Sequence, residues 1–174
     1  MERRLLLNHF RAPWGRSLIL ISLLAASISL AVVLWPVPSA RNFGPGAIVL
    51  IVRVVLLAVL VGSALFAIRG YTVTPDSILI HRLLWATRLS RSSLESARFE
   101  PRAMRGSLRL FGNGGLFSFT GYFYSRLLGR YRAFVTDPQR TIVLCFRRGT
   151  VVISPDDPAA FVDAIAASRA GRLS

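Results

Sequence analysis

The sequence contains no lysine, a single cysteine and only two histidines. All 22 basic residues are arginines and stand against 8 acidic residues, so the formal net charge is +14. The lone Cys145 excludes an internal disulfide, and its apolar neighbours indicate a small buried hydrophobe rather than a nucleophile. His9 and His81 lie far apart in the sequence, without companions spaced like metal ligands. The composition therefore gives no support for a metal site or a cofactor.

Recognisable catalytic patterns are also missing. No histidine accompanies a candidate nucleophile and base, and no nucleophile elbow occurs. The glycine-rich run at 112–115 lacks the Gly-Lys-Ser/Thr ending of a phosphate loop, and the chain is too short for an NTPase domain. Asp156 and Asp157 directly precede Pro158, which is the pattern of a helix N-cap rather than of an acid–base pair. We therefore expect a protein that is not an enzyme.

Charge is absent from residues 17–35, and residues 47–68 form a second apolar stretch. At 1.5 Å per residue, each stretch matches a hydrocarbon core of about 30 Å. Arg53 lies near the start of the second stretch, where it can snorkel to the interface. The small residues at 37–40 would suit a signal-peptide cleavage site. The first stretch, however, is longer than the apolar region of a signal peptide, which usually has about 7–15 residues. The pattern predicts a two-helix transmembrane hairpin over 17–68.

Arginines flank this hairpin unevenly. Four lie in the basic N-terminal segment 1–16, at positions 3, 4, 11 and 16, whereas the connecting loop carries only Arg41. The positive-inside rule then predicts a multi-pass protein of the plasma membrane with both termini in the cytoplasm. The net charge favours anionic partners such as lipid headgroups. The arginines are scattered and accompany no known nucleic-acid-binding motif, so we expect no nucleic-acid partner.

From residue 69 to 174 the pattern is that of a separate α+β domain. Apolar residues recur with period two, so that Ile78 and Ile80 share one face of a strand predicted at 77–83. Other strands are predicted at 71–73, 86–90, 94–99, 130–136, 141–147 and 150–154, with 108–111 as a further candidate. A final helix is predicted from Pro158 to Gly171. Its apolar residues Phe161, Val162, Ile165 and Ala166 fall on one face.

Three segments resemble a known family. They are Tyr71-x-Val-x-Pro-x-x-Ile (71–78), Phe111-Gly-Asn-Gly-Gly-Leu-Phe (111–117) and Val151-Val-Ile-Ser-Pro-Asp-Asp-Pro-x-x-Phe (151–161). With the hairpin in front, the chain resembles the bacterial PH-domain membrane proteins, whose domain is pleckstrin-homology-like. The resemblance implies a β-sandwich or partly open barrel of about seven antiparallel strands. A C-terminal helix would cap its open end, with Phe161 and Ile165 as the plug.

The resemblance also bears on ligand binding. Eukaryotic lipid-binding PH domains use a basic loop between their first two strands, but the turn at 74–77 has no arginine and one acid. The more suggestive segment is 116–131, where aromatic rings lie beside arginines without any acid. Interfacial anchors combine these residue types, although some of the rings could instead line the core. The candidate binding residues are Phe117, Phe119, Tyr122, Arg126 and Arg130.

Two functions are therefore expected for this membrane-tethered domain. The first is a PH-like binding or scaffolding module that docks a protein partner, or a second copy of itself, at the cytoplasmic membrane face. The alternative is a sensor of anionic lipids. The sequence does not indicate which protein or which lipid is bound.

Overall fold

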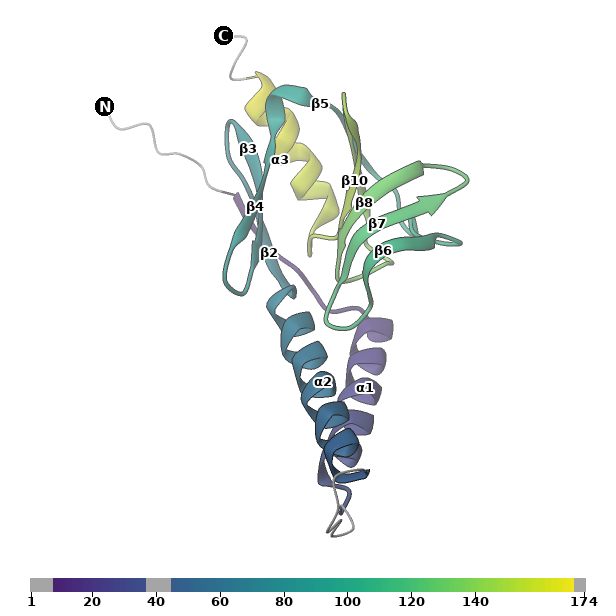
Figure 1. The fold of residues 1–174 in the computed structure, drawn as a ribbon. Coiled ribbons are helices and arrows are strands. Elements are labelled where there is room, and N and C mark those ends of the chain that lie inside the picture. The colour runs from purple at the N-terminus through teal and green to yellow at the C-terminus, as the bar shows by residue number, and fades with distance from the viewer. Residues whose placement is uncertain (1–7, 37–44, 171–174) are drawn as a thin grey trace, which may run out of the picture.

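The computed structural model describes residues 8–36 and 45–170. Two long helices stand against one end of a domain made of two β-sheets and a third helix (Figure 1). The helices are α1 (Arg16–Leu34), α2 (Pro45–Leu65) and α3 (Pro158–Ala170). The strands are β1 (Asn8–Arg11), β2 (Ile68–Val73), β3 (Ser77–Arg82), β4 (Ala86–Ser90), β5 (Leu94–Phe99), β6 (Leu108–Gly114), β7 (Phe119–Ser125), β8 (Gly129–Val135), β9 (Ile142–Phe146) and β10 (Gly149–Ile153).

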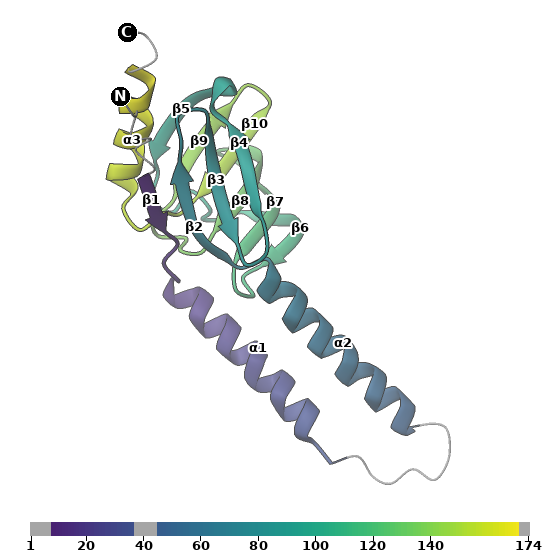
Figure 2. The same cartoon turned by 90° about the vertical axis from the view of Figure 1, so that its left-hand side faces the viewer.

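Helices α1 and α2 run side by side away from the sheets (Figure 2). Both are long and apolar enough to cross a membrane, and most of their side chains are exposed, unlike those of a core helix in a globular domain. Their bounds lie close to the predicted stretches 17–35 and 47–68, although α2 ends at Leu65. Arg53 donates a hydrogen bond to the carbonyl of Trp35, at the end of α1. The small residues at 37–40, the arginines at 3, 4 and 41, and the predicted helix end at Gly171 lie outside the described residues.

The described strands form two sheets. The first has the order β1-β2-β3-β4, and the second has the order β5-β9-β10-β8-β7-β6. All pairs are antiparallel except β8 and β10, whose parallel register runs from Tyr131 opposite Thr150 to Phe134 opposite Ile153. The expectation of about seven strands, all antiparallel, is therefore corrected: the described residues form ten strands, with one parallel pair. The parallel pair arises because the β9–β10 hairpin folds back and inserts β10 between β9 and β8.

The main core joins both sheets to α3. It includes Tyr71 and Ile80 from the first sheet, and Phe134 and Leu144 from the second. Phe161 of α3 is fully buried among them, with its ring edge-on to Phe10 at 5.0 Å and to Tyr71 at 6.4 Å between centroids. The Tyr71 hydroxyl donates a 2.7 Å hydrogen bond to the carbonyl of Phe134, and burial raises the pKa of Tyr71 to about 12. The predicted capping role of Phe161 and Ile165 fits these contacts.

A second core lies on the opposite face of the second sheet. Its buried residues are Ala103, Phe123, Tyr131, Ala133, Val135, Val143 and Val152. Cys145 is partly buried and packs against this cluster, as expected for a small hydrophobe. Because Phe123 and Tyr131 are buried here, two rings of the aromatic segment 116–131 are structural.

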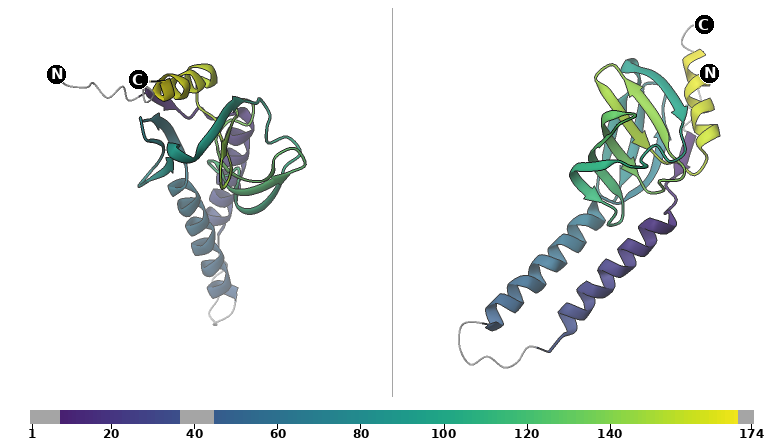
Figure 3. Two further views of the ribbon diagram at one scale, coloured as in Figure 1. Left: turned by 90° about the horizontal axis from the view of Figure 1, so that it is seen from above. Right: turned by 90° about the vertical axis from the view of Figure 1, so that its right-hand side faces the viewer.

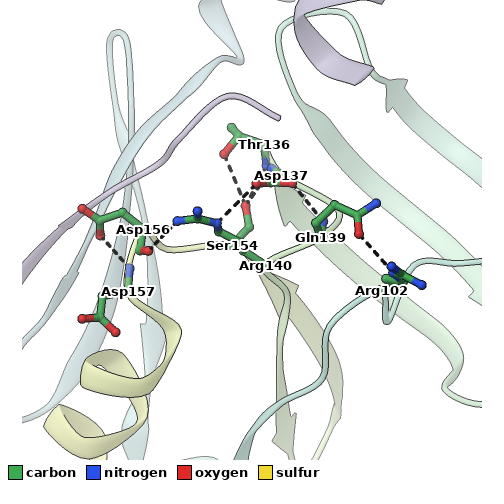
Figure 4. Close-up of polar contacts among 8 residues, drawn as sticks. All are labelled: Arg102, Thr136, Asp137, Gln139, Arg140, Ser154, Asp156 and Asp157. Atoms are coloured by element: carbon green, nitrogen blue, oxygen red, sulfur yellow. Dashed lines mark hydrogen bonds and ion pairs between the residues drawn. The ribbon is translucent and has the colours of Figure 1, made fainter. Parts of the chain in front are cut away.

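Strand β1 comes from the segment that precedes the first long helix. Its Phe10 packs in the main core, and the Arg11 backbone N–H donates to the Asp156 carboxylate at 3.1 Å. Asp157 caps α3, accepting a hydrogen bond from the Ala160 N–H at 3.0 Å. Arg140 donates to the Asp156 carbonyl at 3.1 Å (Figure 4). Part of the expected N-terminal segment 1–16 therefore belongs to the folded domain, which the boundary at residue 69 did not include.

Candidate functional site

The five predicted binding residues do not form one surface. The ring of Phe117 lies 6.0 Å from that of Trp14, and its backbone N–H donates to the Ser22 hydroxyl of α1 at 3.0 Å. Phe117 thus holds the turn between β6 and β7 against α1. Phe119 is partly buried and packs on the second core. Both rings have structural contacts that the sequence pattern alone did not separate from a docking role.

Only Tyr122 and Arg130 are brought together. The Arg130 guanidinium carbon lies 4.9 Å from the centre of the Tyr122 ring, and that of Arg132 lies 6.0 Å from the same ring. Arg126 is exposed in the turn that follows β7. The docking role of these five residues stays a prediction.

Tyr122 and Arg130 line a cavity of about 620 Å³ between the two sheets. We call it the arginine groove. Its arginines are Arg88 on β4, Arg130 and Arg132 on β8, and Arg148 in the turn between β9 and β10. β4 is the last strand of its sheet, so no strand within the described residues pairs with its outer edge. Three consecutive residues of β4, Arg88 to Ser90, line the groove. No acidic residue is among the described residues that line it.

A second cavity, of about 710 Å³, adjoins the groove and shares Tyr122 and Arg132 with it. We call it the α2 pocket, because the last turns of α2 form one wall. Its lining residues are Val59, Gly62 and Ser63 of α2, Phe66 just after α2, Arg82 of β3, Arg109, Phe111, Gly112 and Asn113 of β6, Leu116, Thr120, Gly121 and Tyr122 near or on β7, and Arg132 of β8. The two cavities form a positively charged seam that reaches the end of α2.

Arg82 is the most buried charge in this seam, with 8% of its surface exposed. Its guanidinium carbon lies among the rings of Phe66, Trp85 and Phe134, at 5.3, 5.4 and 5.2 Å from their centres. Its Nε has no hydrogen-bond partner in the described part of the chain. Burial lowers the pKa of Arg82, and the charge of Arg132 lowers it further. Aromatic faces stabilise the cation but do not supply the acceptor that its Nε–H lacks.

Sequence reasoning missed Arg82 and Arg132 as members of a site, although the alternation along their strands contained a signal. Arg82 continues the face of Ile78 and Ile80, and Arg132 shares a face with Phe134. A charged residue at a core-facing position is unusual and often functional. Burial alone was not sufficient evidence, because Arg91 is also buried yet has a structural role. Its guanidinium donates to the Thr74 carbonyl at 2.9 Å and to the Ile165 carbonyl at 2.7 Å.

The chemistry that these cavities offer is fixed positive charge beside ring faces, which suits the binding of anions. Within residues 8–36 and 45–170, no three histidine, cysteine, aspartate or glutamate side chains are grouped so that they could hold a metal ion.

Comparison with known proteins agrees with this picture of the fold. No curated protein and no solved structure matches the chain. A family model described as bacterial PH domain matches residues 69–168, which include β2 except its first residue, all the strands from β3 to β10 and most of α3. PH domains are generally binding modules rather than catalysts. The match covers more than half of the chain, and the protein therefore belongs to the bacterial PH-domain family.

Proposed function

We propose that this protein is a membrane-anchored, non-enzymatic binding module whose arginine groove docks an acidic segment of a protein partner at the cytoplasmic membrane face. The observation that carries the proposal is the groove itself, lined by four arginines and by no acid among its described residues. A protein field of one sign attracts and orients a ligand of the opposite sign. The chain has only 8 acidic residues, so a second copy of itself is a poor ligand for this groove.

The unpaired edge of β4 suggests how such a segment binds. An extended peptide can add to an exposed sheet edge through main-chain hydrogen bonds, while its side chains select the site. A peptide along β4 would place alternate acidic side chains toward Arg88 and toward the arginines of the opposite sheet. The anchor supports this mode, because confinement at a surface raises the effective concentration of weakly bound partners.

The anchor is the pair α1 and α2. Both leave the same end of the domain (Figure 3), and both expose apolar side chains along their length. A bilayer would cover that surface, which is otherwise costly in water. The excess of arginines before α1 over those in the connecting loop supports a cytoplasmic location for both termini, in a plasma-membrane protein that spans the bilayer twice.

This topology predicts the behaviour of reporters in a bacterial host. Alkaline phosphatase fused after Ser174 is expected to be inactive, because that enzyme folds only in the periplasm, whereas the same enzyme inserted within 37–44 is expected to be active. A cytoplasmic fluorescent reporter at each position serves as the complementary control. Phosphatase activity after Ser174 would contradict the proposed orientation.

The docking proposal is tested with the full chain in nanodiscs of phosphatidylcholine, whose headgroups carry no net charge. A fluorescent oligoglutamate peptide is the probe, and its binding is followed by anisotropy. Each exposed ion pair contributes roughly 0.2–1 kcal/mol, so Arg88→Glu with Arg148→Glu is expected to weaken binding about tenfold. The matched control, Arg98→Glu with Arg102→Glu, reverses the charge of two exposed arginines that do not line the groove.

The control makes the result specific. Equal weakening by both pairs would show that the peptide responds only to net charge, and unchanged binding by the groove pair would place the peptide elsewhere. Either outcome overturns the docking site. Loss confined to the groove pair supports it, and that loss should diminish as salt rises because exposed charges are screened.

A further inference from the structure

The buried arginine of the α2 pocket requires a different explanation from the exposed arginines of the groove. A buried charge is costly unless it is paired and hydrogen-bonded. Arg82 is more than nine-tenths buried, and no carboxylate pairs with it in the described part of the chain. Three rings enclose its guanidinium, while its Nε lacks an acceptor. The donors that remain suit an anion with several oxygens.

The pocket contains two further positive charges and no acid among its described lining residues. Arg109 is exposed on β6, and Arg132 is partly exposed on β8. Arg132 stacks over Phe134 at 4.7 Å, on the same ring that contacts Arg82. This arrangement favours a ligand with net negative charge. A zwitterionic headgroup would bring an ammonium into a site that has no carboxylate to receive it.

The position of the pocket indicates where the anion comes from. One wall consists of the last turns of α2, the helix that the proposed function places in the bilayer. A Cβ added at Gly62 would meet no atom within 4 Å, so the wall is open at that residue. Val59, one turn earlier, is 53% exposed and continues the apolar surface along the helix. A phosphate in the pocket could therefore remain attached to acyl chains that lie along α2.

We propose that the α2 pocket binds the phosphate of an anionic membrane lipid, with Arg82 as the buried contact and Arg109 and Arg132 beside it. The inference rests on the proposed membrane anchorage but not on the docking of an acidic peptide. It also differs from lipid binding through the turn between β2 and β3, because that turn carries Asp76 and no arginine.

The test uses the full chain in a neutral detergent, titrated with phosphatidylglycerol or phosphatidylcholine. Native mass spectrometry counts the lipids bound, and the unfolding temperature is recorded in parallel. Phosphatidylglycerol is expected to bind at least about tenfold more tightly than phosphatidylcholine and to raise the unfolding temperature. Arg82→Met, which keeps an unbranched side chain against the rings, is expected to abolish this preference. Without lipid it should unfold no earlier than the wild type, because a costly buried charge has been removed.

Two further variants keep the test informative if Arg82→Met fails to fold. Arg109→Gln changes an exposed side chain of the same pocket and is expected to weaken phosphatidylglycerol binding several-fold. Arg69→Met is the matched control, since Arg69 is exposed just after α2 but lines neither cavity. It should bind phosphatidylglycerol as the wild type does.

Four outcomes would overturn the proposal. Equal binding of both lipids excludes an anionic headgroup site, and equal loss in Arg69→Met reduces the effect to general surface charge. Equal protection by free inorganic phosphate makes the ligand a soluble anion rather than a lipid. Loss of oligoglutamate binding in Arg82→Met with lipid binding intact assigns the pocket to a protein partner. Conversely, loss of lipid preference with oligoglutamate binding intact supports the pocket independently of the docking proposal.

Discussion

Phe161→Ala is expected to lower the free energy of unfolding by about 3–5 kcal/mol, the usual cost of removing a fully buried aromatic side chain. Phe161 is 0% exposed, and its ring meets Phe10 and Tyr71 edge-on. These two partners come from β1 and β2, on opposite sides of the apolar helices in the sequence. The ring therefore joins α3 both to the strand that precedes the apolar helices and to the strand that follows them. Its loss opens a cavity that the rigid sheets cannot fill.

The measurement is thermal or urea unfolding of the full chain in detergent, followed by tryptophan fluorescence. Leu127→Ala serves as the control, because Leu127 is 91% exposed and its truncation should change stability by less than about 0.5 kcal/mol. A loss below about 1 kcal/mol for Phe161→Ala would mean that α3 does not plug the core. In that case Tyr71 and Phe134 would have to form a stable core without it.

The features predicted correctly from the sequence depend on local patterns. Stretch length and polarity located α1 and α2, and the Asp-Asp-Pro run located the start of α3. Alternation located β3, β4 and β5 closely, because each has one face toward the interior. The role of Phe161 was also accessible, since the family resemblance supplied the fold in which that residue acts as the plug.

The features missed from the sequence depend on distant pairings. β1 lies in a short basic stretch, and it becomes a strand because its residues pair with β2 across both helices, with His9 opposite Thr72. β7 was hidden because rings occupy both of its faces, with Phe123 buried and Tyr122 and Tyr124 exposed. In such a strand hydrophobicity does not alternate.

The candidate site was only partly predictable for the same reason. Tyr122 and Arg130 were identified from the local sequence pattern, but the other arginines of the seam come from β3, β4, β6, β8 and the β9–β10 turn. Arginines are scattered throughout this chain, so no single one was distinguished by its residue type. Arg82 becomes exceptional only when its burial and its three aromatic neighbours are known.

The glycine-rich segment 111–117 contains one member of a glycine pair that lies at a close approach of two strands. Gly112 on β6 and Gly121 on β7 are register partners, and both line the α2 pocket. Their φ angles are +111° and +139°, in a region that L side chains rarely adopt. A Cβ added at Gly121 would overlap the carbonyl oxygen of Phe111 and lie 2.8 Å from the Gly112 Cα. The two strands therefore approach too closely for any side chain at this point.

Gly121→Ala is expected to destabilise the full chain by about 3–5 kcal/mol, combining backbone strain of about 1–3 kcal/mol with a similar cost of displacing β6. Gly129→Ala is the matched control, because Gly129 has a φ of +64° but no atom within 4 Å of an added Cβ. It incurs only the left-handed strain, about 1–2 kcal/mol.

Unfolding of both variants in detergent, measured as for Phe161→Ala, separates the clash from the strain. Equal losses would show that β6 yields without cost, and the close β6–β7 contact would then not determine the shape of the α2 pocket. A larger loss for Gly121→Ala, accompanied by weaker phosphatidylglycerol binding, would identify the glycine pair as the feature that holds this wall of the pocket in place.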